Sequence, residues 1–262
     1  MIVLEFTRYL LNINEDGVAI FTANRPEKLN AVDTVSWIEL RQFFEWANTA
    51  DEVKAIILTG AGDKAFIAGA DLNSLKTKRP VDCLDNLGQA ATYAIENCAK
   101  PVICAVNGYA FGGGCEIAIS CDFRVCSENA LFALPETGLG ILPGAGGTLR
   151  LTRLIGLGRA KDVILLGKQI DAQEAVRIGL ATACVPQDQL LDEALKMCKK
   201  LLKKAPVSLK LAKRVLNNSF ASSVEVANTL EYLALSSLCG TEDKMEGVTS
   251  FLEKRKPEYK GT

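Results

Sequence analysis

The residues best suited to chemistry are three consecutive glycines, Gly112-Gly113-Gly114, with Glu116 close behind them. The glycines follow a short apolar run, Val102 to Val106, that predicts a buried strand, and they precede an apolar stretch that predicts a helix. Glycines at a strand-to-helix turn let a ligand approach backbone N–H groups. A helix N-terminus adds unpaired donors and the positive end of its dipole. We therefore expect a site for an oxygen that carries or develops negative charge.

Two acidic residues are candidates to act at this site. Glu116 lies about one helical turn beyond Gly113, so its carboxylate can project over the same pocket. Its neighbours are mostly apolar, and a carboxylate among them is costly unless it is paired or functional. Glu136 follows Pro135 at the exit of an apolar strand. Each acid alone could be structural or exposed, but two acids near a glycine-built oxyanion site predict acid–base chemistry.

Histidine is absent from the sequence, which excludes Ser-His-Asp catalysis, Cys-His catalysis and histidine-ligated metal sites. Proton transfer must then use carboxylates, lysine, tyrosine or cysteine. There are nine cysteines and no C-x-x-C pair, which argues against a disulfide framework and a zinc ribbon. Most of these cysteines sit in apolar runs, where the residue acts as a small hydrophobe. We expect no metal.

The composition is that of an ordinary globular protein, with 262 residues, 48% hydrophobic and 23% charged. The net charge of -1 gives no sign of binding to nucleic acid or to an anionic membrane. No apolar run approaches the length of a membrane span, and the N-terminus lacks a signal-peptide pattern. Gly144-Ala145-Gly146-Gly147 lacks the G-K-[ST] of a phosphate loop. A cytoplasmic enzyme is the expectation.

The elements that must position these residues are predicted strands and helices that alternate along the chain. This alternation favours an α/β core. Two β runs, Leu10 to Ile13 and Val18 to Ala23, predict a hairpin, and Asp33 can cap a helix through about Asn48. The further predicted strands are Ala55 to Gly60, Ala65 to Ala68, Val102 to Val106, Asp122 to Cys126, Ala130 to Leu134 and Ala181 to Val185. The further predicted helices are 82–98, Thr148 to Ile155, Gly158 to Leu166 and one that Asp171 caps and Gly179 stops.

Beyond Pro186 the pattern is helical, with breaks near Pro206, Ser219 and Gly240. The change in composition near residue 200 divides the chain into a catalytic core, 1–200, and a helical C-terminal subdomain, 201–262. Five lysines lie near the end of one predicted helix, at positions 196–204. We interpret them as a solvated face whose charges interact favourably with the helix dipole, and we prefer this interpretation to nucleic-acid binding.

Five stretches, in this order and spacing, form a very specific pattern: Asn24–Ala31, Ala65–Asp71, Asn107–Glu116, Leu134–Gly140 and Pro143–Thr148. With them the chain resembles the crotonase (enoyl-CoA hydratase/isomerase) family along essentially its whole length. The resemblance implies an α/β fold, a spiral of β-β-α units followed by a helical trimerisation region. It also implies a homotrimer, or a homohexamer built as a dimer of trimers.

Carried over by position, the resemblance implies an oxyanion hole made by the backbone N–H groups of Ala70 and Gly113. Hydratases of the family have glutamate at the positions of both Glu116 and Glu136, whereas many isomerases keep only one. This implies a hydro-lyase of fatty acid metabolism that adds water to a trans-2-enoyl-CoA, giving a 3-hydroxyacyl-CoA, reversibly. Glu116 would help deprotonate a water and Glu136 would give a proton to the α-carbon. No cofactor is expected, because coenzyme A belongs to the substrate.

The resemblance also implies where coenzyme A binds. Ala68 would offer backbone contacts to adenine, beside Asp71, and Lys28 and Lys64 are candidates for the phosphates. Leucine stands at 134 and 149, where many hydratases have glutamine, which bears on acyl preference and positioning. Three alternatives stay open at this stage: an enoyl-CoA isomerase, a hydratase for a branched or cyclic acyl group, and a non-catalytic RNA-binding relative.

Overall fold

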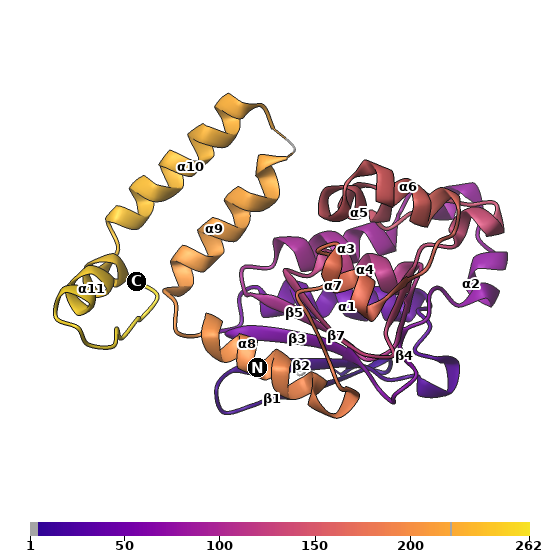
Figure 1. Ribbon diagram of the computed structural model, residues 1–262, viewed down its shortest axis with the longest axis horizontal. Helices are drawn as coiled ribbons and strands as arrows, with labels where there is room; N and C mark the ends of the chain where they lie inside the picture. Colours follow the sequence, from indigo (N-terminus) through magenta and orange to yellow (C-terminus); the bar gives the residue numbers. More distant parts are fainter. Residues whose placement is uncertain (1–4, 221) are drawn as a thin grey trace.

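The structure of the protein is a computed structural model that describes residues 5–220 and 222–262. Its strands lie in two sheets that share a repeated strand–strand–helix pattern (Figure 1). The strands are β1 (Tyr9–Ile13), β2 (Val18–Ala23), β3 (Ala55–Gly60), β4 (Ala65–Ile67), β5 (Val102–Val106), β6 (Tyr109–Phe111), β7 (Phe123–Ser127), β8 (Leu131–Ala133), β9 (Ile170–Asp171) and β10 (Ala183–Val185).

Helices follow the strand pairs and then occupy the whole C-terminal part. The α-helices are α1 (Thr34–Ala47), α2 (Leu72–Lys76), α3 (Leu87–Asn97), α4 (Gly113–Ser120), α5 (Gly147–Ile155), α6 (Leu157–Leu165), α7 (Ala172–Arg177), α8 (Leu190–Leu201), α9 (Pro206–Ser219), α10 (Val224–Cys239) and α11 (Glu242–Leu252). Short 3-10 turns are η1 (Pro26–Lys28), η2 (Pro80–Cys83), η3 (Glu136–Leu139) and η4 (Gln187–Gln189).

The two sheets explain the repeated unit. The larger sheet has the order β1-β2-β3-β5-β7-β10, antiparallel between β1 and β2 and parallel elsewhere. The smaller has the order β4-β6-β8-β9. Each of β3, β5 and β7 lies in the larger sheet, and the next strand of the chain crosses to the smaller sheet before a helix follows. This is the predicted spiral of β-β-α units.

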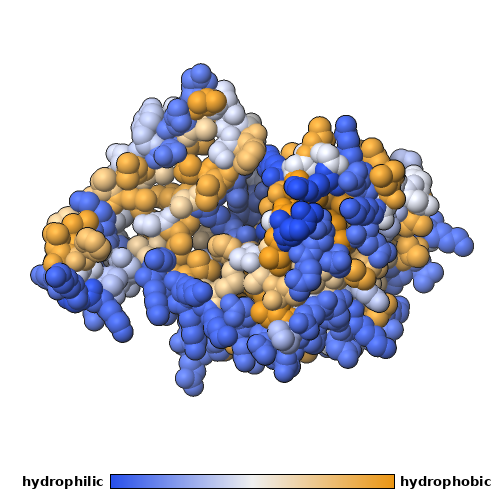
Figure 2. All heavy atoms as spheres, in the orientation of Figure 1, coloured by the Kyte–Doolittle hydropathy of each residue, from blue (hydrophilic) through white to orange (hydrophobic). Residues whose placement is uncertain are grey.

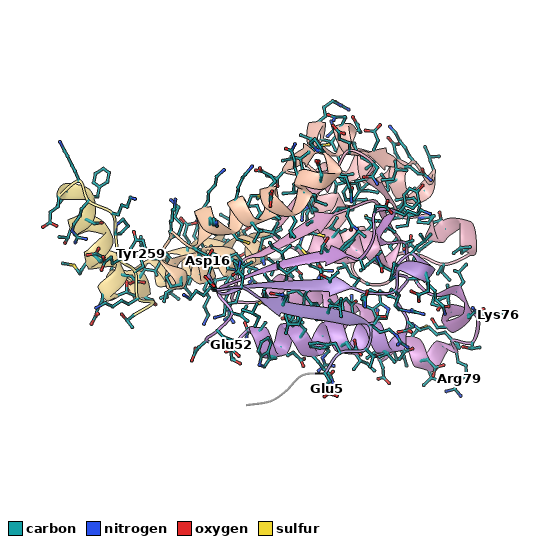
Figure 3. The ribbon with its side chains drawn as sticks, turned by 90° about the horizontal axis from the view of Figure 1, so that it is seen from below. Glu5, Asp16, Glu52, Lys76, Arg79 and Tyr259 are labelled. Carbon is teal, nitrogen blue, oxygen red and sulfur yellow. The ribbon has the colours of Figure 1, made fainter. Side chains whose placement is uncertain are left out.

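Side chains on β3 alternate between two buried layers, as the two-residue period of a strand requires. Ile56 and Leu58 belong to the main core, which α1 and α3 cover, whereas Ala55 and Ile57 face a second cluster around α8. In Figure 3 the sheet is seen from below, with Asp16 and Glu52 at one end and Lys76 and Arg79 at the other. The region of α2 and η2 therefore lies at the opposite end of the strands from the β1–β2 turn.

Helices α9, α10 and α11 extend from this core as an arm (Figure 1). Neither α9 nor α10 contains a fully buried residue. The space-filling view shows hydrophobic side chains along the arm (Figure 2). Large ones with more than half of their surface exposed include Leu216, Phe220, Tyr232, Leu233, Leu235 and Phe251. The arm begins after α8, near the predicted boundary at residue 200, but the division into two domains stays a prediction.

Most sequence-based elements are confirmed, with three differences. The predicted helix 82–98 is wrong at its start, because the chain forms η2 first and α3 begins only at Leu87, where the Asn86 side chain accepts the N–H of Gln89. The strands β6 and β9 and the short helix α2 were not predicted, since runs of three, two and five residues carry little periodic signal. Helix α4 begins at Gly113, so the glycines form its first turn. No helix in the described ranges is long and apolar enough to cross a membrane.

Candidate active site

The glycine turn between β6 and α4 is built from positions that tolerate no side chain. Gly112 has φ 49° and ψ −122°, a backbone conformation that favours glycine, and its N–H donates to the carbonyl of Ala133 at 2.9 Å. A Cβ on Gly114 would collide with the carbonyl of Ile67. A Cβ on Gly113 would lie 3.0 Å from the Trp37 ring. The close packing of α4 against β4 therefore requires this glycine run.

Two backbone N–H groups remain free, one at this turn and one at the turn after β4. Gly113 is the first residue of α4, so its N–H has no partner within the helix. Ala70 follows Gly69, whose backbone lies against the glycine turn, and it precedes Asp71. The Gly69 carbonyl accepts from Val32, and the Asp71 N–H donates to the Val32 carbonyl. Among the hydrogen bonds of residues 5–220 and 222–262, neither the Ala70 nor the Gly113 N–H has an acceptor. Both are available to an oxygen of a bound molecule, and their role as an oxyanion hole stays a prediction.

Both residues line one cavity of about 430 Å³. The wall is mainly apolar, and the two predicted acids lie in it together. The lining residues are Trp37, Ala68, Gly69, Ala70, Leu72, Leu75, Lys78, Cys83, Asn86, Gly88, Phe111, Gly112, Gly113, Glu116, Pro135, Glu136, Leu139, Ile141, Leu142, Gly144 and Ala145. The structure thus brings Ala68, Ala70, Gly113, Glu116 and Glu136 into one site.

Glu116 is held by one carboxylate oxygen. Its Oε1 accepts the N–H of Ala145 at 2.7 Å and the N–H of Gly147 at 2.8 Å, from the loop that enters α5. No hydrogen bond to Oε2 forms within the described residues, so Oε2 is left for a ligand or water. The side chain is buried in the first turn of α4, and burial raises its pKa to about 7. The two N–H donors oppose that rise, and the negative charge of Glu136 adds to it.

Glu136 enters the cavity from η3, on the other side of the glycine turn. A Cβ on Gly112 would lie 3.1 Å from Glu136 Oε1, so this side chain rests against the bare backbone of the turn. Its Oε2 is buried and has no hydrogen-bond partner in the described residues. Burial raises the pKa of this carboxyl as well. A buried acid with an unpartnered oxygen is suited to give or take a proton.

The three other predicted binding residues lie outside the cavity wall. Asp71 is engaged in the structure: it caps α2 through the N–H of Asn73, and its Oδ2 lies 3.4 Å from Arg25 and 3.6 Å from Lys28. Lys64 is an exposed residue beside β4, and its carbonyl accepts the N–H of Tyr109. A role in binding coenzyme A stays a prediction for Asp71, Lys28 and Lys64.

Sequence reasoning missed several residues of the site. Lys78 lines the cavity and is a cation there, but nothing distinguishes it from the other lysines in the sequence. The N–H donors Ala145 and Gly147 lie in a motif that the sequence had marked, Pro143–Thr148, without its role being recognised. In the described part of the chain, no group of three or more His, Cys, Asp and Glu side chains could hold a metal ion. The expectation that no cofactor is used stays a prediction.

A comparison with protein families decides the relationship that the geometry suggests. The family model described as enoyl-CoA hydratase/isomerase matches residues 13–262. The chain belongs to the enoyl-CoA hydratase/isomerase family. This confirms the resemblance drawn from the five motifs.

Relatives and solved structures of the family agree with this result. The chain is 43% identical over 246 residues to the short-chain-enoyl-CoA hydratase of Clostridium acetobutylicum, covering 93% of this chain and 94% of that protein. It is 40% identical over 247 residues to the crotonyl-CoA hydratase of Syntrophomonas wolfei, covering 94% of this chain and 95% of that protein. A crystal structure of an enoyl-CoA hydratase from Bacillus anthracis matches with a TM-score of 0.93 and 36% identity, covering 98% of this chain and all of that one. The fold is thus the crotonase fold.

The raised pKa of Glu116 predicts a pH-dependent cost to stability. The native state binds a proton on Glu116 more tightly than the unfolded state does. The contribution of this proton to the free energy of unfolding is therefore complete below the ordinary pKa of 4.5 and is lost as pH rises through about 7. Glu116→Gln keeps an oxygen for both N–H donors and cannot ionise. We expect it to exceed the wild type in unfolding free energy by up to about 3 kcal/mol above pH 7, converted from the shift.

Urea unfolding at pH 5, 6, 7 and 8, at one protein concentration, measures this difference. The gap between Glu116→Gln and the wild type should widen with pH over that range. A gap that stays constant from pH 5 to 8 would show that the Glu116 pKa is not raised in the native state.

Proposed function

We propose that the protein is an enoyl-CoA hydratase that adds water to a trans-2-enoyl-CoA and yields a 3-hydroxyacyl-CoA, reversibly. One observation carries the proposal: two buried glutamates and two free backbone N–H groups share a single, mostly apolar cavity. Membership of the enoyl-CoA hydratase/isomerase family supports the thioester substrate. The name of the Clostridium acetobutylicum relative, a short-chain-enoyl-CoA hydratase, supports a short acyl group.

The first step is polarisation of the thioester. The N–H groups of Ala70 and Gly113 bind the thioester oxygen and withdraw electron density through the conjugated double bond, so the β-carbon becomes electrophilic. As water adds, charge moves onto that oxygen and an enolate develops. Both hydrogen bonds and the N-terminal dipole of α4 strengthen with that charge, so they stabilise the transition state more than the bound substrate.

Proton transfer falls to the two glutamates. A water between them gives a proton to ionised Glu116 and forms the C–O bond at the β-carbon. Protonated Glu136 gives its proton to the α-carbon, so the acyl group gains H and OH. A pKa of about 7 leaves an appreciable fraction of Glu116 ionised at neutral pH. Burial favours the protonated form of Glu136, as an acid requires.

The same site explains why hydration is preferred to isomerisation. An isomerase moves a proton between two carbons of the acyl chain and needs no water beside a second acid. Here Glu116 and Glu136 both line the cavity, and Glu116 is fixed through Oε1. Oε2 of each has no hydrogen bond from residues 5–220 or 222–262. This arrangement is suited to holding a water between two carboxyl groups.

Glutamine variants test these roles. We expect Glu116→Gln and Glu136→Gln each to lower kcat for hydration of trans-2-butenoyl-CoA by at least about 100-fold, the usual contribution of general acid–base catalysis. Loss of the conjugated thioester absorbance measures turnover. Glu128→Gln, the same change at an exposed position, serves as the control. Activity of Glu116→Gln within about tenfold of the wild type would exclude Glu116 as the base.

Deuterium exchange separates the two acids in the same experiment. The 3-hydroxyacyl-CoA is incubated in deuterated water and deuterium at the α-carbon is followed by mass spectrometry. Glu136→Gln should lose this exchange. Exchange that persists in Glu136→Gln and disappears in Glu116→Gln would mean that the roles are reversed. Conversion of 3-butenoyl-CoA without formation of the hydroxy product would instead identify an isomerase.

We further propose that the chain acts as a homotrimer or a homohexamer in the cytoplasm. The support for assembly is the arm, where α9 and α10 carry no fully buried residue and expose many large apolar side chains. A surface of this kind is normally covered by another subunit. Its location in the cytoplasm stays a prediction.

Light scattering measures the assembly directly. We expect the wild type to have three or six times the mass of one chain. The double variant Tyr232→Glu/Leu233→Glu places charges on the exposed surface of α10, and we expect it to shift the protein to smaller species. A wild-type protein that stays monomeric at micromolar concentration would contradict the proposal.

A further inference from the structure

The loop that holds Glu116 is itself held from behind by buried polar residues. Its two N–H groups, from Ala145 and Gly147, point to Glu116. The carbonyl of Ala145 points the other way, where it accepts from Thr92 Oγ1 at 2.7 Å and from Arg150 Nη1 at 2.9 Å. The Ala145 residue is therefore fixed on both sides, by the catalytic carboxylate and by these two donors.

Arg150 is the centre of this support. It is buried, with a side chain only 8% exposed, and Nε and Nη2 both donate to Oε2 of Glu96, at 3.1 and 2.7 Å. Its Nη1 also donates to Thr92 Oγ1 at 3.1 Å. Gly146, at φ 94°, lies against the same Nη1, and a Cβ there would collide with it. Burying a guanidinium is costly, and this one is paired with Glu96 and has a hydrogen-bond acceptor for each of its three nitrogens.

Neither Arg150, Thr92 nor Glu96 lines the active-site cavity. They act on the substrate only through the loop and through charge. We propose that Arg150, held by Glu96 and assisted by Thr92, is a positioning residue for hydration: it fixes the Ala145 peptide so that Oε1 of Glu116 is bound and Oε2 is aimed at the water, and its positive charge favours the ionised base. This inference rests on the hydratase function proposed above.

The positive charge of Arg150 acts on Glu116 in one direction. The Arg150 guanidinium lowers the pKa of Glu116, against burial and the charge of Glu136, which raise it. Removing the cation should therefore move the rising limb of the kcat–pH profile to higher pH, since less of the base is ionised at any given pH. The titratable and charged groups around Glu116 in the cavity and behind it are Cys115, Glu136, Lys78, Cys83, Arg150 and Glu96.

Four variants test the inference in the full-length protein. We expect Arg150→Met to lower kcat by at least about tenfold with little change in KM, and to shift the rising limb upward. Arg150→Lys keeps the charge with fewer hydrogen-bond donors. The rising limb of its kcat–pH profile should therefore lie closer to the wild-type pH, and part of kcat should be recovered. Thr92→Val removes one hydrogen-bond donor to the Ala145 carbonyl and no charge. It should therefore lower kcat and leave the rising limb of the kcat–pH profile at the wild-type pH. Arg159→Met, at an exposed position on α6 where the side chain donates to the Ile155 carbonyl and not to Glu96, is the control and should change neither.

Folding is checked by circular dichroism and by binding of the 3-hydroxyacyl-CoA product. If Arg150→Met does not fold, Glu96→Gln/Arg150→Gln replaces it, because it removes both charges of the buried pair. An upward shift is still expected, but a smaller one, since loss of the Glu96 charge offsets part of the effect of losing the cation. If neither folds, Thr92→Val decides, and a wild-type kcat in that variant overturns the inference. A rising limb that is identical in wild type and folded Arg150→Met also overturns it.

A second readout is independent of hydration. Infrared titration of the carboxylate band that is lost in Glu116→Gln reports the ionisation of Glu116 itself. It should titrate at higher pH in Arg150→Met than in the wild type. If the wild type hydrates no enoyl-CoA, the proposed function fails, and this titration still decides the role of Arg150. If the wild type hydrates and the Glu116 titration does not move, only the inference about Arg150 fails.

Discussion

The site depends on one interaction, the pair of hydrogen bonds from Ala145 and Gly147 to a single oxygen of Glu116. A carboxylate buried in the first turn of an apolar helix is unfavourable by itself, and the two N–H donors recover part of that cost. They satisfy Oε1 and leave Oε2 free. The pKa therefore rises only to about 7, where the group can still be ionised at neutral pH. If Glu116 is the base proposed above, stability and catalysis are opposed in this residue, because burial favours the protonated form and a base must be ionised.

The β-β-α spiral supplies the rest of the geometry. Each unit sends one strand to the larger sheet and the next to the smaller sheet, and a turn then leads to a helix. The turn after β4 presents the N–H of Ala70, the turn after β6 presents that of Gly113, and the exit of β8 presents Glu136. Because β4, β6 and β8 are neighbours in one parallel array, groups from three distant stretches of sequence meet in one cavity.

Much of this could be predicted from sequence. The glycine run and Glu116 lie at the start of an apolar helix that follows an apolar strand, so the local sequence pattern sufficed to place them near the N-terminus of α4. The absence of histidine excluded histidine-dependent catalysis and histidine-ligated metal sites. The five motifs indicated the crotonase family. Other features depend on tertiary contacts. Nothing local pairs Arg150 with Glu96, 54 positions away, or turns Ala145 toward Glu116. The short strands β6 and β9 form because neighbouring strands hold them, and the break before α3 depends on the Asn86 cap.

In the proposed mechanism, the Ala70 and Gly113 N–H groups bind the thioester oxygen and polarise the carbonyl. Isotope-edited infrared spectroscopy of trans-2-butenoyl-CoA labelled with ¹³C at the thioester carbonyl, bound to Glu116→Gln to slow turnover, measures this directly. Two hydrogen bonds aimed at the oxygen weaken the C=O bond, so we expect a lower stretching frequency for the bound thioester than for the free one in water. A bound frequency equal to or above the frequency in water would contradict an oxyanion hole at this turn.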